Sequence, residues 1–179
     1  LATFAQAVNP SLIKNLPYNA SRDLIPVAMV GNSPNVLVVP SQSPFQSVAD
    51  VIAYAQKFPG KLTYASQGNG TSAHLAGELF ISLTKVDMVH IPYKGAAAAL
   101  QDVMAGQVSL MFVAISTALP FIKDGKLIPI AVGSLDRLAV IPDVPTIAES
   151  GYPGFEAIAW QGVLAPKGTP PKLIEKISG

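Results

Sequence analysis

The sequence predicts an α/β fold with a mainly parallel sheet. Short apolar segments alternate with segments of helical periodicity through the middle of the chain, in the order strand, helix, strand, helix, strand, helix, strand. Glycines end several of the helical segments. Half of the 179 residues are hydrophobic and only 13% are charged, so the chain can bury a substantial core. An alternating order of this kind is typical of parallel sheets covered by helices.

The four strands of this core are expected at residues 61–66, 86–91, 108–113 and 127–132, and its three helices at 71–84, 96–105 and 117–123. The first helix is the clearest, because Leu75, Leu79 and Leu83 recur four residues apart. Gly106 follows the second helix at a favourable C-terminal capping position, and Gly125 follows the third. Right-handed crossovers would bring the ends of the first three strands to one edge of the sheet.

Flanking elements are expected on both sides: strands at 27–30, 36–39 and 157–164, a turn at 31–34, a helix at 47–56, and a last helix opened by Thr169-Pro170-Pro171. Ser47 and Asp50 form a capping-box-like start for the helix at 47–56. The strands at 36–39 and 157–164 bracket the core, as two segments that cross between two lobes would do.

Charge and composition exclude several classes of function. The chain has 12 basic and 11 acidic residues and no basic stripe, so nucleic acid is not an expected partner. It has no cysteine, which rules out a disulfide framework and thiolate metal sites. The uncharged stretch between Asp102 and Lys123 is long enough to span a bilayer, but it contains glycine, serine, threonine and proline. We interpret it as a buried strand followed by a helix start.

The glycine-rich loop after the first core strand is the sharpest candidate site. Glycines let the backbone approach a ligand closely, and the N-terminus of the following helix offers unpaired N–H groups that favour anions. Hydroxyl groups in the loop could add donors. The alternative is an ordinary turn in which Thr71 or Ser72 caps the helix. The candidate ligand-binding residues are Ser66, Gly68, Asn69, Gly70, Thr71 and Ser72.

The same loop matches a weak dinucleotide fingerprint, in which Gly68, Gly70 and Ala73 occupy the glycine positions. A nicotinamide site would need an acidic residue at the carboxyl end of the next strand, to hold the ribose. Asp87 lies at the beginning of that strand instead. The sequence therefore does not predict a nucleotide, and no cofactor is expected.

Two further segments fall at the same predicted edge. Tyr93, Lys94 and Gly95 follow the second strand, and they offer a phenol, a cation and a flexible backbone to a ligand. Ser116 and Thr117 follow the third strand and are also candidate ligand contacts. Lys94 could equally be a solvated surface charge, and the serine–threonine pair could be an ordinary helix cap.

The two histidines do not form a convincing metal site, and neither a metal ion nor a catalytic residue is predicted. His74 and Glu78 are four residues apart but lack a third ligand. We expect His74 to support the loop from behind and His90 to be buried and hydrogen-bonded. A Ser–His–acid triad stays open as an alternative, although no Gly-x-Ser-x-Gly elbow occurs. The competing class of function is therefore an α/β enzyme, either a hydrolase or a nucleotide-dependent oxidoreductase.

Five motifs in one order resemble the Bug-type receptors of tripartite tricarboxylate transporters. They are Tyr64-Ala65-Ser66-x-Gly68-x-Gly70-Thr71-Ser72-x-His74-Leu75-Ala76-Gly77-Glu78; His90-x-Pro92-Tyr93-Lys94-Gly95; Gly106-Gln107-Val108; Pro142-Asp143-Val144-Pro145-Thr146-x-x-Glu149-x-Gly151-x-Pro153-Gly154; and Leu164-Ala165-Pro166-x-Gly168-Thr169-Pro170. Together they cover nearly the whole chain and are far more specific than any one of them.

The resemblance implies a bacterial periplasmic protein of the type II binding-protein fold, without enzymatic activity. Two lobes joined by two crossing strands would close on a small carboxylate (a di- or tricarboxylate, an amino acid or an aromatic acid) and deliver it to transporter membrane subunits. On this basis residues 1–40 are a remnant of the first lobe with the first crossing strand. Residues 41–156 form a complete second lobe, and residues 157–179 return to the first. The resemblance also implies that an N-terminal part is missing here.

Two expectations concern the ligand. Ser109 and the pair Val113-Ala114 stand where the family often has acidic or amide residues, so the ligand is expected to differ or to be more apolar. With one complete lobe, the 179-residue chain is expected to bind small dicarboxylates weakly, because association itself costs about 4–15 kcal/mol. The first-lobe remnants, residues 1–33 and 167–179, are expected to be mobile or to pair with another copy, because unpaired strand edges favour association.

Overall fold

The computed structural model describes residues 1–178. The chain divides into two compact units. One consists of Leu1–Asn32 together with the segment from Ala159 on, and the other is Ser33–Ile158. The second unit contains the predicted core and every candidate site residue.

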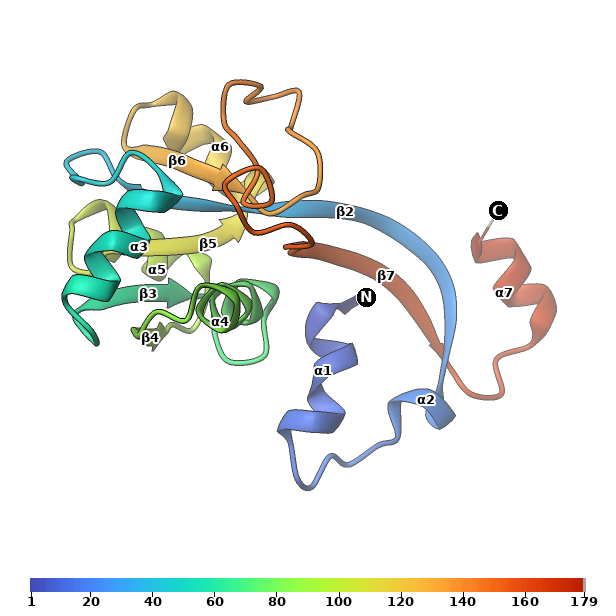
Figure 1. Ribbon diagram of the computed structural model, residues 1–179. Helices are drawn as coiled ribbons and strands as arrows, with labels where there is room; N and C mark the ends of the chain where they lie inside the picture. Colours follow the sequence, from blue (N-terminus) through green and yellow to red (C-terminus); the bar gives the residue numbers. More distant parts are fainter. Residues whose placement is uncertain (179) are drawn as a thin grey trace. The chain divides into compact units, whose positions relative to one another are not determined.

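The second unit is an α/β unit with a mainly parallel sheet, which confirms the predicted fold class (Figure 1). Its strands are β2 (Leu24–Pro40, which begins in the other unit), β3 (Leu62–Ser66), β4 (Met88–Pro92), β5 (Leu110–Ala114) and β6 (Leu127–Val132). They lie in the order β6-β2-β5-β3-β4. Strand β3 pairs in parallel with β4 and β5, whereas β2 is antiparallel to β5 and β6.

Strand β2 corrects the prediction of two short strands with a turn at 31–34, because it runs unbroken from Leu24 to Pro40. Its second half lies between two neighbours, and Val36 pairs with both Val113 and Val132. Partners on both sides hold residues 36–38 extended directly after the predicted turn, and residues 31–34 continue the same strand. Pro34, which has no N–H to donate, precedes the first residue of the ladder with β5, Asn35.

Helices cover both faces of this sheet. One face packs against α3 (Val48–Lys57) and α4 (Ser72–Thr84), the other against α5 (Ala96–Met104) and α6 (Ile115–Lys123). Side chains alternate along β5, since Leu110 and Phe112 join the first cluster whereas Met111 and Val113 join the second. The uncharged stretch after Asp102 thus contains a buried strand and a helix, as predicted. Within residues 1–178, no helix has the length and apolar character needed to cross a membrane.

The predicted helix ends are present in detail. Ser47 Oγ accepts a hydrogen bond from the Asp50 N–H at 3.1 Å, and Asp50 accepts one from the Gln46 N–H at 3.0 Å, so α3 has the predicted capping-box-like start. The bonds that the Asp50 carboxylate accepts, first from the Gln46 N–H and then from the Ser47 hydroxyl, lower the pKa of Asp50. Gly106, after α5, adopts the left-handed backbone expected of a C-terminal cap, with φ of 73°.

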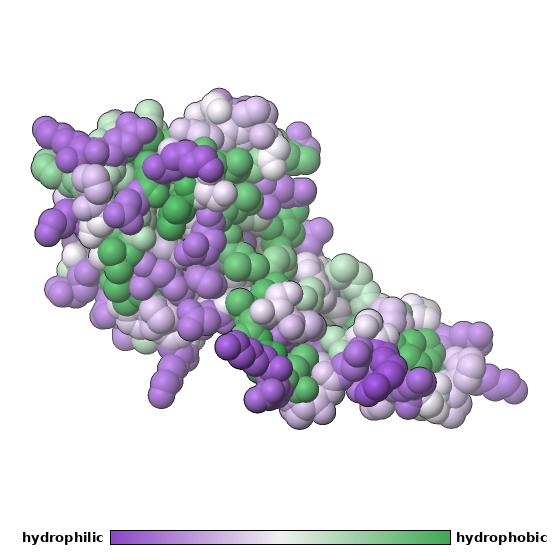
Figure 2. Space-filling view, turned by 60° about the horizontal axis from the view of Figure 1, so that its bottom comes forward, coloured by the Kyte–Doolittle hydropathy of each residue, from purple (hydrophilic) through white to green (hydrophobic). Residues whose placement is uncertain are grey.

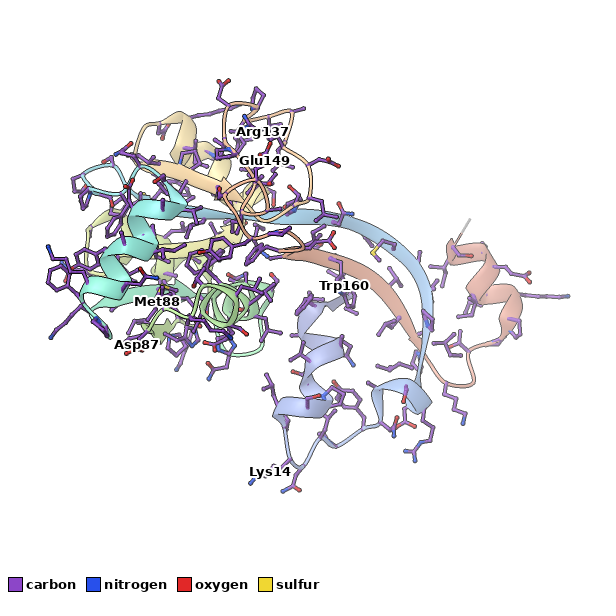
Figure 3. All side chains as sticks on the ribbon, viewed as in Figure 1. Lys14, Asp87, Met88, Arg137, Glu149 and Trp160 are labelled. Carbon is purple, nitrogen blue, oxygen red and sulfur yellow. The ribbon has the colours of Figure 1, made fainter. Side chains whose placement is uncertain are left out.

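A long segment without helix or strand, residues 133–157, connects β6 to β7 and contains the fourth family-like motif. Figure 3 shows Arg137 and Glu149 side by side in this segment, where Arg137 Nε lies 3.0 Å from the carboxylate. Glu149 also accepts the Thr146 N–H at 2.7 Å. The Thr146 N–H and Arg137 both lower the pKa of Glu149. These residues of the motif therefore fix the shape of the segment.

The other unit contains β1 (Ala2–Thr3), α1 (Phe4–Leu12), α2 (Ala20–Asp23), the first half of β2, β7 (Ile158–Pro166) and α7 (Pro171–Ser178). Strand β1 pairs antiparallel with β7, where Ala2 lies opposite Gly162. The predicted last helix is α7; Gly179, the last residue of the predicted third segment, lies outside the described residues. A cavity of about 790 Å³ opens between α1, α2 and Trp160.

Figure 2 shows hydrophobic residues reaching the surface in small patches between hydrophilic ones. Exposed hydrophobic side chains are scattered over both units, for example Met29, Val89 and Val140, which are 68%, 42% and 57% exposed. Scattered exposure of this kind is normal for a folded protein.

Candidate binding site at the carboxyl edge of the sheet

The ends of β3, β4 and β5 meet at one edge of the sheet, as the sequence predicts. Ser66 lies opposite Pro92 in the parallel ladder, and the Tyr93 N–H donates to the Ser66 carbonyl at 3.0 Å. Helices α4, α5 and α6 follow these three strands directly. Their N-termini, with unpaired N–H groups and the positive end of the helix dipole, therefore begin at the same edge.

The loop between β3 and α4, residues 66–72, has the shape of a tight backbone cradle. Gly68 and Gly70 have φ of 130° and 75°, values that residues other than glycine rarely adopt. A Cβ atom at Gly68 would also approach the Tyr93 carbonyl to 3.3 Å. Thr71 caps α4, since its Oγ1 accepts the His74 N–H at 3.4 Å and donates to the Gly68 carbonyl at 2.7 Å. The loop is thus set by glycine backbone and by internal hydrogen bonds.

Ser66 is fully buried, and its hydroxyl group is used inside the loop. Its Oγ accepts the Gly68 N–H at 3.1 Å and lies 3.1 Å from the Gly68 carbonyl. It also lies 2.7 Å from His90 Nε2. Ser66 therefore stabilises the loop. A ligand would instead contact the loop backbone, the exposed Asn69 side chain and the first turn of α4, which begins at Ser72.

Tyr93, Lys94 and Gly95 have different surroundings at the end of β4. The Tyr93 hydroxyl donates to Asp102 Oδ2 of α5 at 2.6 Å, and burial together with this bond raises the pKa of Tyr93 to about 12. That hydroxyl is therefore already occupied. Lys94 is exposed, and Gly95 is the N-cap residue of α5. Lys94 is the cation that this segment offers to an anion.

Helix α6 begins at Ile115, two residues before the predicted start, so Ser116 and Thr117 lie in its first turn. Both are exposed. Ser33 Oγ lies 3.2 Å from Ser116 Oγ and accepts the Ser116 N–H at 3.5 Å. Sequence reasoning missed Ser33, because 83 residues separate the two serines and local sequence carries no signal of such a contact.

Behind the loop, aromatic rings of three elements form a stack. His74 of α4 lies on His90 of β4 with 4.2 Å between ring centroids, and Tyr64 of β3 lies on the other side of His90 at 4.7 Å. His74 Nδ1 accepts the Gly70 N–H at 3.1 Å, and the Tyr64 hydroxyl donates to Glu78. Burial and the neighbouring His74 lower the pKa of His90, against a smaller opposing effect of Glu78. The first family-like motif contains Tyr64 and Glu78, but the sequence does not predict their contacts with each other or with His90.

Ser109 lies just before β5, at the amino edge of the sheet and therefore opposite the candidate site. Its Oγ lies 3.1 Å from Thr63 Oγ1, and each residue's N–H donates to the other's hydroxyl. A cavity of about 260 Å³ lies beside it, lined mainly by apolar groups such as Phe45, Tyr54 and Val108.

Residues 1–178 contain no group of three or more side chains suited to holding a metal ion.

Comparisons with known proteins show the family of the chain. The model of the tripartite tricarboxylate transporter family receptor matches residues 1–179. An uncharacterised protein of Pseudomonas sp. (strain P51), from the tcbD-tcbE intergenic region, is 42% identical over 164 residues, which are 91% of this chain and 49% of the relative. Protein BugT of Bordetella pertussis is 41% identical over 168 residues, 94% of this chain and 52% of BugT. The chain spans about half the length of these curated relatives.

Two solved structures are also similar. The R. palustris protein Rpa4515 with adipate is 36% identical and has a TM-score of 0.87; the match covers 92% of this chain and 55% of the Rpa4515 chain. MatC from Rhodopseudomonas palustris with bound malate is 32% identical and has a TM-score of 0.90; the match covers 98% of this chain and 60% of the MatC chain. The fold is that of periplasmic binding proteins. Within that class, the chain belongs to the receptor family of tripartite tricarboxylate transporters.

Proposed function

We propose that the protein captures a small carboxylate at the carboxyl edge of its second unit, in the bacterial periplasm, for delivery to the membrane subunits of a tripartite tricarboxylate transporter. The observation that carries this proposal is the meeting of three helix N-termini with the glycine cradle of residues 66–72. Lys94 adds a positive charge, and the loops 66–72, 92–95 and 114–117 contain no acidic residue. An edge with these helix N-termini and this charge attracts anions.

The relatives support a carboxylate as the class of ligand. Adipate and malate, found in two similar structures, are both small dicarboxylates. Because the chain spans about half the length of its curated relatives, the rest of such a protein could add further contacts. The proposal therefore concerns the class of ligand, and the edge residues named above are its proposed contacts.

The protein is proposed to be a binding protein without enzymatic activity. Ser66 and His90 lie 2.7 Å apart, as a nucleophile and its base would. However, Ser66 is fully buried and already accepts the Gly68 N–H, so a substrate cannot reach its hydroxyl. The protein should therefore not turn over a small ester such as p-nitrophenyl acetate above the uncatalysed rate. Turnover that disappears in Ser66→Ala would overturn this part of the proposal.

Ligand charge provides the direct test of the proposed class. Adipate and its uncharged analogue adipamide have the same carbon chain, so they differ only in the groups that the helix N-termini and Lys94 would recognise. Adipate and malate should raise the melting temperature of the protein at millimolar concentration, whereas adipamide should not. Equal shifts with adipate and adipamide, at constant ionic strength, would contradict recognition of a carboxylate.

Thr71→Val tests the loop itself. Valine keeps the shape but removes the cap of α4 and the bond to the Gly68 carbonyl, so we expect a loss of about 1 kcal/mol in unfolding free energy. If Thr71 also contacts or orders the carboxylate site, adipate affinity should fall roughly ten- to a hundredfold, as for one charge-assisted hydrogen bond. Thr71→Ser keeps the hydroxyl and is the control. Unchanged affinity in titration calorimetry would remove Thr71 from the site.

A further inference from the structure

The glycine cradle is held from behind by two histidines, one at each end. The Gly70 N–H donates to His74 Nδ1 at 3.1 Å, and Ser66, which anchors Gly68, lies 2.7 Å from His90 Nε2. The two imidazole rings stack with 4.2 Å between centroids and 21° between planes. Gly70 is buried, so its N–H has no ready alternative partner in water. The shape of the loop therefore depends directly on both rings.

The contact with Gly70 defines the protonation state of His74. A nitrogen that accepts an N–H carries no proton, so His74 holds its proton on Nε2, which lies 3.8 Å from Glu78 Oε1. A second proton could enter only at Nδ1, where it would displace the Gly70 N–H. Protonation of His74 is thus incompatible with the observed loop.

The charged and titratable groups around the stack come from each element that packs against it. Helix α4 presents Glu78, β3 presents the Tyr64 hydroxyl bound to Glu78, and β4 presents His90. Lys94 is exposed at the end of β4, and β5 presents the apolar Phe112 to this face. Two positive imidazoles stacked at 4.2 Å would repel each other. The cradle as observed therefore requires a neutral His74, and it disfavours a state in which both rings are charged.

We propose that His74 and His90 are positioning residues that keep the cradle of residues 66–72 in its binding conformation at neutral pH and release it on acidification. Its functional consequence is that a carboxylate is bound at neutral pH and released in acid, and this consequence rests on the proposed function. Its structural part, the opening of the cradle, can be measured without any ligand.

The direction of the pH effect follows from the surroundings of His90. Burial, and then the neighbouring His74, lower the pKa of His90 below the ordinary value of 6.5. An opened loop would let this histidine take up a proton at its ordinary pKa, whereas the closed loop resists protonation. The closed loop is therefore fully favoured above pH 6.5 and loses its advantage as the pH falls from 6.5 through the lowered pKa.

Nuclear magnetic resonance of the ligand-free, 15N-labelled protein tests the structural part. Between pH 8 and pH 5, the Gly68 and Gly70 amide signals should shift together, and hydrogen exchange at Gly70 should accelerate at least tenfold relative to Val113. In His74→Asn the amide oxygen can occupy the position of Nδ1 and accept from Gly70 without titrating. That variant should keep the neutral-pH signals and lose most of their pH dependence.

Two results would overturn the proposal: glycine signals that do not titrate in the wild type, or an identical titration in His74→Asn. If His74→Asn does not fold, His90→Gln provides the second test, since its side-chain amide can replace Nε2 at Ser66. The same comparison then applies to Gly68.

Adipate provides the functional arm. Wild-type affinity should fall at least tenfold more than that of His74→Asn between pH 7.5 and 5.5; the ligand's own ionisation affects both proteins equally. Equal losses would overturn the link to binding. If adipate and malate bind neither protein at any pH, the proposed function fails, and the glycine signals alone decide whether the histidines control the loop.

Discussion

Gly77→Ala is expected to destabilise the second unit by about 3 kcal/mol, at the upper end of the range for overpacked cores. Gly77 lies in α4 directly over the ring of Tyr64, and a Cβ atom there would lie only 2.2 Å from Tyr64 Cε2. Tyr64 is fully buried, so its ring cannot move aside. Helix α4 would have to move away from β3, and the cradle between them would move with it.

Gly31→Ala is the matched control, because nothing lies within 4 Å of the new Cβ and the residue is exposed. It should change the unfolding free energy by less than about 1 kcal/mol. Tyr64→Leu shortens the side chain beneath the helix. A double variant that combines it with Gly77→Ala should therefore recover part of the stability lost in Gly77→Ala. Urea unfolding of the four proteins measures these differences. Equal midpoints for Gly77→Ala and Gly31→Ala would contradict the observed packing of α4 on β3.

Phe112→Ala is expected to cost about 3–5 kcal/mol, as do other deletions of buried aromatic side chains. Phe112 lies in β5, at the centre of the sheet, and is fully buried. Its ring contacts Phe80 of α4 and Phe155 of the 133–157 segment, with centroids 5.8 and 6.3 Å away. The cavity left by alanine would therefore loosen three parts of the core at once.

The exposed Val89 provides the comparison for this substitution. Val89→Ala, at a side chain that is 42% exposed, should cost less than about 1 kcal/mol. Phe112→Leu should fall between the two, since leucine fills part of the space. Chemical denaturation with the same slope in all variants would make the midpoints comparable. A loss below 1 kcal/mol for Phe112→Ala would show that this cluster is not the core of the unit.

Elements whose signals are local were predictable from the sequence. The leucine repeat of α4, the capping box at Ser47 and the left-handed glycine after α5 all depend on neighbours a few residues away. The meeting of loops at one edge was also predictable, because the handedness of crossovers fixes it. In contrast, β2 lies between β5 and β6, and no local feature of Val36 indicates those two partners.

The structure brings the predicted site residues to one edge of the sheet, but several of their side chains bond within the protein. Ser66, Thr71 and Tyr93 were chosen for their hydroxyl groups, and all three use them on other parts of the protein. A buried hydroxyl must find a partner, and the nearest turn or helix usually supplies one. The contacts of Ser33 and Tyr64 could not have been predicted, because their partners lie far away in the sequence or on another element.

The central claim is that a carboxylate binds at the carboxyl edge of the second unit, and chemical-shift mapping with adipate tests it most directly. The method detects millimolar binding, so it applies even if the 179-residue chain binds weakly. On titration of the 15N-labelled protein at pH 7.5, the amides of Gly68, Gly70, Thr71 and Gly95 should move most and saturate with one dissociation constant. Shifts confined to the amino edge around Phe45 and Tyr54, or no saturable shifts at all, would contradict the claim.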